Sequence, residues 1–202
     1  MDREFSITFI RHAQAQNNLV FDQNDVELPR KIYDSSLTDY GIEQAHKLHN
    51  VVNKLNFDII YVSPLERTLK TSSIIFGDTK IPIYSNELLR EYKDSYANYR
   101  TSISEKKEKY PIVNFDQINS DNDVMEDEIE KRRKILCFNQ IIKTKAEYMI
   151  DRVYNFIKIL SEGEHRNICI VSHLGFIYMF GHLLNYNLRP SNCQISKIRV
   201  KL

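Results

Sequence analysis

An arginine and a histidine stand side by side at the end of the first predicted strand. Residues 5–10 are rich in β-branched and aromatic side chains, as a buried strand is, and Arg11 and His12 follow directly. Ligands in open α/β sheets bind at the carboxyl ends of strands, where an Arg–His pair could hold and attack an anion. The alternative is a strand that ends in two polar residues at the solvent, and the dipeptide alone does not decide between them.

Two later strands end in a similar manner. Residues 167–171 form an apolar run followed by Ser172 and His173, and the apolar run 57–62 precedes a helix with Arg67 in its first turn. In a parallel sheet these strand ends lie on one edge, so two histidines and two arginines would converge. Arginine is a rigid fork for phosphate oxygens, and a neutral imidazole is a nucleophile. The pattern therefore indicates a phosphoryl-transfer pocket that needs no metal ion.

The elements that must position these residues alternate between strand and helix. Two more strands are predicted, at residues 81–84 and 194–201. The apolar spacing, the charge pattern and the capping residues predict helices over 42–55, 65–76, 101–110, 121–134, 146–160 and 176–184. Such alternation favours an α/β fold with a mostly parallel sheet covered on both faces.

Two stretches show no sustained period. Residues 13–36 are polar and are expected to form a long loop, and residues 92–145 are expected to be an irregular insertion in a single domain spanning 1–202. The charge runs at 106–109 and 126–134 are interpreted as solvated helix faces, because charge runs usually lie on exposed faces.

The composition excludes several classes of protein. The 202 residues carry a formal net charge of +1, so no strong field favours nucleic acid or a membrane surface. There is no long apolar run, the charged N-terminus is unlike a signal peptide, and the three cysteines show neither metal nor disulfide spacing. We expect a cytoplasmic protein with no metal, no cofactor, and no nucleic-acid or membrane partner.

Five short blocks of sequence carry a family resemblance. They are Arg11-His12-Ala13-Gln14 with Asn18, Leu37-Thr38-x-x-Gly41-x-x-Gln44-Ala45, Ser63-Pro64-Leu65-x-Arg67-Thr68-x-x-Thr71, Leu89-Arg90-Glu91, and Val171-Ser172-His173-Leu174-Gly175. In this order they resemble the histidine phosphatase superfamily, which has the phosphoglycerate mutase-like fold. The resemblance implies a three-layer α/β/α sandwich and a phosphatase that hydrolyses phosphate monoesters through a phosphohistidine intermediate.

The resemblance also implies a role for each matching residue in the phosphate pocket. His12 would be the nucleophile, and Arg11 and Arg67 would bind the phosphoryl oxygens and offset their charge. His173 would donate a hydrogen bond to the same group, and Asn18 would be a secondary phosphate contact.

The last role implied is that of Glu91, as the acid that protonates the leaving oxygen and then the base that activates water. Taken alone, a Glu in this setting is more often a surface residue, and its neighbour Arg90 is expected to face solvent. The other histidines match no block and are expected to be structural or exposed: His46, His49, His165 and His182.

Departures from the family pattern keep other functions open. Ala15, Asn17 and Leu174 stand where the pattern often has Gly, His and Gly, so the loop could be reshaped and the pocket mouth narrowed. A phosphate-binding or scaffolding protein without turnover is therefore the alternative outside the enzymes.

The substrate is expected to be a phosphorylated small molecule or a phosphopeptide. The residues after Glu91 do not resemble the pattern of phosphoglycerate mutases, which favours a phosphatase over a mutase-like phosphotransferase. Arg100, Lys106 and Lys107 are the cations that could meet a second anionic group on the substrate.

Overall fold

A mixed sheet of five strands forms the centre of the computed structural model, which describes residues 3–22, 32–52, 54–92, 95–123 and 138–202. The strands are β1 (Glu4–Arg11), β2 (Ile59–Val62), β3 (Ile83–Ser85), β4 (Asn167–Ser172) and β5 (Ile195–Lys201), in the order β3-β2-β4-β1-β5. The first four run parallel, and β5 pairs antiparallel with β1 at one edge. The predicted, mostly parallel sheet is confirmed.

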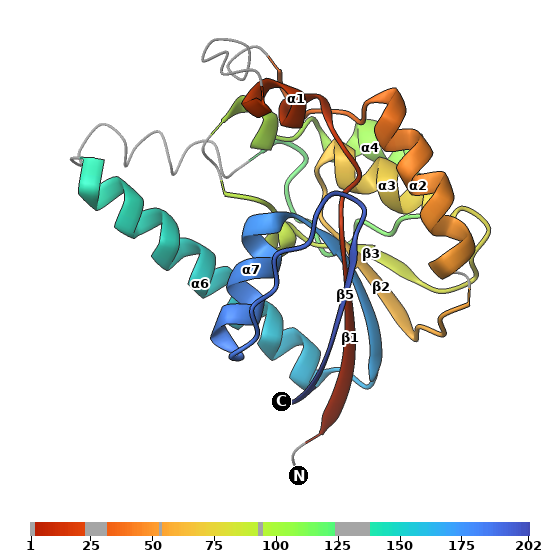
Figure 1. The fold of residues 1–202 in the computed structure, drawn as a ribbon, viewed down its shortest axis with the longest axis vertical. Helices are drawn as coiled ribbons and strands as arrows, with labels where there is room; N and C mark the ends of the chain where they lie inside the picture. The colour runs from red at the N-terminus through yellow and green to blue at the C-terminus, as the bar shows by residue number, and fades with distance from the viewer. Residues whose placement is uncertain (1–2, 23–31, 53, 93–94, 124–137) are drawn as a thin grey trace.

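Helices cover both faces of this sheet, which gives three layers (Figure 1). On one face lie α6 (Phe138–Glu162) and α7 (Leu174–Leu183); on the other lie α2 (Asp39–Val52), α3 (Glu66–Phe76) and α4 (Ile103–Lys109). A short helix, α1 (Gln16–Asp22), follows β1, and two 3-10 turns, η2 (Glu87–Leu89) and η3 (Tyr96–Asn98), follow β3. The predicted α/β/α sandwich is thus confirmed.

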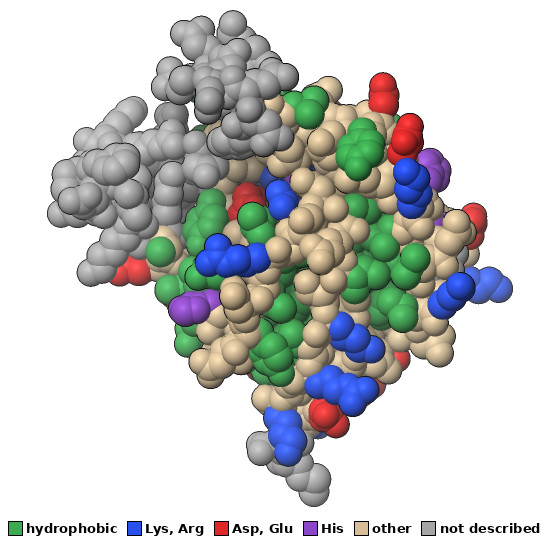
Figure 2. Space-filling model, viewed as in Figure 1, with side chains coloured by type: hydrophobic (Ala, Val, Ile, Leu, Met, Phe, Trp, Pro, Cys, Tyr) green, Lys and Arg blue, Asp and Glu red, His purple; other side chains and the backbone are tan. Residues whose placement is uncertain are grey.

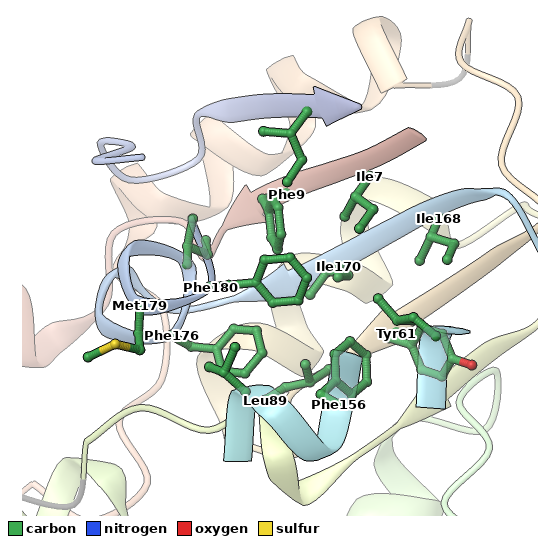
Figure 3. Packing of buried hydrophobic residues seen from close by; sticks show 14 of the residues in the cluster. Ile7, Phe9, Tyr61, Leu89, Phe156, Ile168, Ile170, Phe176, Met179 and Phe180 are labelled. Carbon is green, nitrogen blue, oxygen red and sulfur yellow. The ribbon is translucent and has the colours of Figure 1, made fainter. Parts of the chain in front are cut away.

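The pleat of the strands divides the core into two apolar clusters. Ile168 and Ile170 of β4 face α6 and α7, whereas Cys169 and Val171 face the opposite layer, as the period of two requires. The first cluster is rich in aromatic rings that meet edge to face, such as Phe156 against Tyr61 with 5.2 Å between centroids (Figure 3). The inner strands β2 and β4 are buried on both faces, because helices pack on each side of them, whereas the edge strand β5 alternates buried and exposed residues.

Three of the predicted elements differ from the structure. Part of the expected loop 13–36 forms α1, which at seven residues is too short to show an apolar period; the Asn18 side chain accepts from the Ala15 amide at its start. The expected helix 146–160 begins earlier, at Phe138, so the expected irregular insertion ends in helix. Of the expected helix 121–134, residues 121–123 are irregular and the rest lies outside the described residues.

Candidate active site

The carboxyl ends of the three inner strands lie side by side, because the register of the sheet is fixed by its hydrogen bonds. The His12 amide donates to the Ser172 carbonyl over 3.0 Å, and the Ser63 amide donates to the Val171 carbonyl over 3.1 Å. His12 and Ser63 directly follow β1 and β2, and Val171 and Ser172 end β4, which lies between these two strands in the sheet. The chain therefore brings the ends of three distant segments into one place, as the sequence predicts.

His12 is held in a single tautomer. Its Nδ1 atom lies 2.8 Å from the Ala13 carbonyl oxygen, which only accepts, so Nδ1 carries the proton and Nε2 keeps its lone pair. The ring is 3 % exposed. Burial, and then the nearby Arg67 guanidinium, hold the pKa of His12 well below its usual 6.5. The imidazole is therefore neutral near pH 7, with Nε2 available as a nucleophile.

Arg67 presents its guanidinium to that lone pair. The side chain leaves the first turn of α3, and its Nε donates to Nε2 of His12 over 3.3 Å. Its two terminal nitrogens are fixed by the Ala97 carbonyl at 2.8 Å and by Oδ1 of Asn98 at 2.6 Å. A buried cation thus stands beside the nucleophile with its orientation set before any ligand arrives.

His173 lies across from His12, with 5.1 Å between the two ring centroids. Its Nε2 pairs with the Ser63 hydroxyl at 2.8 Å, while its buried Nδ1 has no hydrogen-bond partner among the described residues. Burial, followed by the charge of Arg67, holds the pKa of His173 well below 6.5. A neutral ring whose Nε2 accepts from Ser63 would carry its proton on Nδ1, where it could donate to an anion.

Arg11 is half-buried and reaches the segment that precedes β5. Its Nη1 donates to the Pro190 carbonyl over 3.1 Å, and its buried Nε has no partner among the described residues. Burial lowers the pKa of Arg11, and Glu91 partly offsets this.

Asn18 lines the same cleft. Its Oδ1 accepts from the Ala15 amide at 2.9 Å, so the Asn18 side-chain nitrogen is the group left to meet a ligand.

Glu91 follows η2 and is fastened by two backbone amides. Its Oε1 accepts from the Tyr92 amide at 2.9 Å and its Oε2 from the Gly175 amide at 3.0 Å, at the start of α7. A side chain at position 175 would not fit, since a Cβ there would lie 2.1 Å from Oε1 of Glu91. Below it, buried Arg152 of α6 donates to the Arg90 carbonyl at 2.7 Å, which fixes the backbone that carries Glu91.

Five of the six predicted site residues line one cleft of about 530 Å³, and the sixth, His173, lies buried beside it against the His12 ring. The cleft is lined by Arg11, His12, Asn17, Asn18, Arg67, Glu91, Tyr92, Asn98, Leu174, Gly175, Tyr178, Arg189, Pro190 and Ser191. Leu174 forms part of its wall and leaves it open. Ala15 is not among the described residues with a positive φ, so the loop after His12 does not require glycine at that position.

Three basic residues were placed wrongly from the sequence. Arg90 does not face solvent: it is 1 % exposed and makes a bidentate ion pair with Asp123 at 2.7 and 2.9 Å. Arg100 is equally buried and pairs with Glu87, and Lys106, expected on the outer face of its helix, is buried against Asp34 at 2.6 Å. Arg100 and Lys106 are therefore committed to the interior, and of the three cations proposed for a second anion only Lys107 is exposed.

Two asparagines that hold residues of the site in place were not predicted from the sequence. Asn98 lines the cleft and binds Arg67, and Asn192 donates to the His12 carbonyl at 3.1 Å and to Oδ1 of Asn18 at 3.2 Å. Asn98 ends the short 3-10 turn η3 and Asn192 lies in an irregular segment, and no period or motif marks either of them. A polar residue just before the last strand is the one signal that could have drawn attention to Asn192.

The remaining histidines do not line this cleft, and they are structural or exposed, as expected. His46, His165 and His182 are exposed, and His49 pairs with the Ile75 carbonyl at 2.8 Å. Within the described ranges, no three His, Cys, Asp or Glu side chains group as they would around a metal ion.

Charged side chains of both signs are interspersed on the face shown in Figure 2, with hydrophobic ones between them. No helix in the described part of the chain combines the length and the apolar character needed to cross a bilayer.

Comparison with known proteins places the chain in a family. The model of the histidine phosphatase superfamily (branch 1) matches residues 7–201. A phosphoglycerate mutase-like protein of Arabidopsis thaliana is 26% identical over 86% of this chain and 72% of its own length. The adenosylcobalamin/alpha-ribazole phosphatase of Escherichia coli is 27% identical over 70% of this chain and 63% of its own length. The fold resembles the crystal structure of the alpha-ribazole phosphatase from Shigella flexneri, with a TM-score of 0.61 and 22% identity over 95% of this chain and 89% of that one.

Proposed function

The chain belongs to the histidine phosphatase superfamily, branch 1, and we propose that it is a phosphatase that hydrolyses phosphate monoesters through a phosphohistidine on His12. The observation that supports this most is the state of His12. Its Nδ1 proton is tied to the Ala13 carbonyl and its Nε2 lone pair stands beside Arg67 in an open cleft. A buried neutral imidazole with one unprotonated nitrogen next to a fixed cation suits attack on a phosphate dianion.

The proposed first step transfers the phosphoryl group to the enzyme. Nε2 of His12 forms a bond to phosphorus while the bond from phosphorus to the ester oxygen breaks. Arg11, Arg67 and Nδ1 of His173 bind the three oxygens that gather negative charge, with Asn18 as a further contact. Glu91 in its protonated form gives its proton to the leaving oxygen, so that a neutral alcohol departs.

In the proposed second step, water hydrolyses the phosphohistidine. Glu91, now a carboxylate, takes a proton from the water as its oxygen attacks phosphorus. The bond between phosphorus and Nε2 breaks, which restores the neutral imidazole and releases inorganic phosphate. Two backbone amides hold the Glu91 carboxylate in the same cleft as His12, which is the position that both steps require.

We propose a phosphorylated small molecule as the substrate. This is the class suggested by relatives named as alpha-ribazole phosphatases, and the cleft of about 530 Å³ is of the size that small ligands occupy. A single domain over 1–202 and a cytoplasmic location stay predictions from the sequence.

The decisive experiment measures phosphate release over a panel of phosphorylated metabolites and phosphopeptides, with His12→Ala as the control. Turnover by the wild type alone, with an acid-labile phosphoenzyme trapped by rapid quenching, would support the proposal. Isomerisation of 3-phosphoglycerate with a bisphosphoglycerate primer and no phosphate release would assign a mutase instead. Phosphate binding without turnover on any substrate would assign the non-enzymatic alternative.

A further inference from the structure

The segment between α7 and β5 is hydrogen-bonded directly to the end of β1, where Arg11 and His12 lie. The Cys193 amide donates to the Arg11 and His12 carbonyls, each over 3.1 Å, and the Pro190 carbonyl accepts from Arg11. Arg189 is therefore one residue away from an atom that a phosphate-binding guanidinium touches. Its backbone is held at the rim of the cleft by contacts with the site itself.

The Arg189 side chain is held at this rim by an aromatic ring. Its guanidinium lies over the ring of Tyr178, 4.5 Å from the centroid, and its Nε donates to Oδ1 of Asn187 over 3.3 Å. Tyr178 follows Leu174 by one turn of α7, and both side chains line the cleft. Stacking limits the freedom of a long, exposed side chain and leaves its terminal nitrogens available to a ligand.

The charges around the cleft leave this arginine without a carboxylate of its own. Among the described residues Arg189 makes no salt bridge, in contrast to buried Arg90 and Arg100, which are both paired with acids. Arg11 and Arg67 lie nearest His12 and would bind the phosphoryl group that is transferred. Arg189 is a third cation on the same cleft, and a single phosphate group is already matched by the first two.

We propose that Arg189 binds a second anionic group on the substrate, a carboxylate or a second phosphate carried by the alcohol part of the phosphate monoester. The proposal rests on the proposed function, because it takes the cleft to be the site of phosphate monoesters. It makes Arg189 a specificity-determining residue, supplied by the segment before β5 rather than by Arg100 or Lys106. The stacked guanidinium offers the second anion two parallel N–H groups while His12 faces the phosphorus.

Equilibrium binding tests this without turnover. In a His12→Ala background, calorimetry compares 3-phosphoglycerate with glycerol 3-phosphate, which differ by a carboxylate in place of a hydroxymethyl group. Adding Arg189→Gln should weaken 3-phosphoglycerate about tenfold and glycerol 3-phosphate less than about twofold, as expected for one charged hydrogen-bonded contact. Glycerol 1,3-bisphosphate replaces the carboxylate by a phosphate and shows which anion is preferred. Equal weakening of all three ligands, or of none, would overturn the proposal.

The matched control is Arg166→Gln. Arg166 also stacks on an aromatic ring, 4.7 Å from the centroid of Phe5, but it precedes β4 and so lies at the opposite end of the sheet. This control should leave all three affinities unchanged, and a loss equal to that of Arg189→Gln would show that the effect is not local. Turnover by the chain with His12 intact is measured separately: no phosphate release from any ligand would refute the proposed function, while the binding series still decides the role of Arg189.

Discussion

Arg67 and Asn98 meet in a buried hydrogen bond, with 2.6 Å between Nη2 of the arginine and Oδ1 of the asparagine. The same asparagine donates from Nδ2 to the Tyr92 carbonyl at 2.7 Å, and its own carbonyl accepts from Arg90 at 2.7 Å. One amide side chain thus connects the Arg67 guanidinium, which we propose to bind phosphate, to the backbone beside Glu91. The position of Arg67 depends on a segment 31 residues away in sequence.

Replacing Asn98 by alanine should loosen Arg67 without removing its charge. A hydrogen bond to a charged group contributes about 1.5 to 3 kcal/mol, so Asn98→Ala should lower kcat/KM roughly 10- to 100-fold. The dissociation constant of inorganic phosphate, measured by calorimetry, should rise as well. Asn119→Ala, at an exposed asparagine, is the control. Unchanged phosphate affinity in Asn98→Ala would show that Arg67 is held well enough by Ala97 and His12.

Glu91→Gln separates acid catalysis from a structural role. General acid help is worth roughly 10²- to 10⁴-fold, and it matters most when the leaving group is a poor one. The rate of phosphohistidine formation from an alkyl phosphate should therefore fall by about this factor, whereas the rate from nitrophenyl phosphate should fall far less. Rapid quenching resolves this first step from the second, in which Glu91 also acts. Equal losses on both substrates would make Glu91 structural, and the acid would have to be another residue.

The buried histidines predict that the protein is less stable in mild acid. Their pKa values are lowered in the folded state, so between those values and about 6.5 the unfolded chain binds more protons than the folded chain. The contribution of these two neutral histidines to the free energy of unfolding is therefore fully present above about pH 6.5, and it is lost as the pH falls below that value. Two such groups would cost up to about 2 to 3 kcal/mol between pH 7.5 and 5.5.

Urea unfolding at these two pH values measures the loss directly. Replacing His173 by glutamine should reduce the pH dependence by about half, because one of the two titrating groups is removed. Replacing the exposed His46 by glutamine should leave it unchanged. A wild-type stability that is flat from pH 7.5 to 5.5 would mean that the folded protein accommodates both imidazolium ions.

Arg90 should matter for stability more than for chemistry. Its pKa is raised, chiefly by Asp123 and Glu87 acting against the effect of burial, and it is 1 % exposed. Arg90→Met removes the cation that forms a bidentate pair with the buried Asp123 carboxylate, which should cost about 3 to 5 kcal/mol. The double variant Arg90→Met/Asp123→Leu should recover part of that loss in urea unfolding, since both charges of the buried pair are then removed. Arg199→Met, at an exposed arginine of β5, is the control.

Chelation should leave the reaction intact. In the proposed mechanism Arg11 and Arg67, which line the cleft, balance the negative charge of the phosphoryl group, so no divalent ion is needed. Phosphate release is measured after dialysis against EDTA and again after adding Mg²⁺, Mn²⁺ or Zn²⁺. A loss on chelation that one of these ions restores would contradict the mechanism.

The strands and the ends from which the site is built could be predicted from the sequence. Apolar runs marked β1, β2 and β4, and the polar residues directly after them had to meet once the strands were parallel. The amphipathic helices were found for the same reason: burial of one face leaves a period in the sequence. These signals are local, so a single chain displays them.

The surroundings of the site could not be predicted in the same manner. Arg90 and Lys106 lie in polar stretches, and their burial depends on Asp123 and Asp34, which are 33 and 72 residues away. A buried charge is possible only with a partner, and no local pattern reveals which acid will be that partner. The role of Asn98 in the site could not be predicted for the same reason, because Asn98 holds Arg67, a residue that is distant in the sequence.

The close fit of Gly175 against Glu91 offers a way to stop the enzyme halfway. One added methyl group would strike both Oε1 of Glu91 and the Tyr92 ring, at 2.1 and 2.5 Å, and would push the carboxylate from its seat. The three atoms nearest to that methyl group belong to Glu91 and Tyr92, not to His12 or Arg67. With an aryl phosphate, which needs no acid, Gly175→Ala would still load its histidine, and the water that should unload it would lack a base. A single methyl group would thus convert a catalyst that turns over into a protein that stays phosphorylated on His12 after it reacts with its substrate. The stable phosphoenzyme would then show which compounds can phosphorylate it.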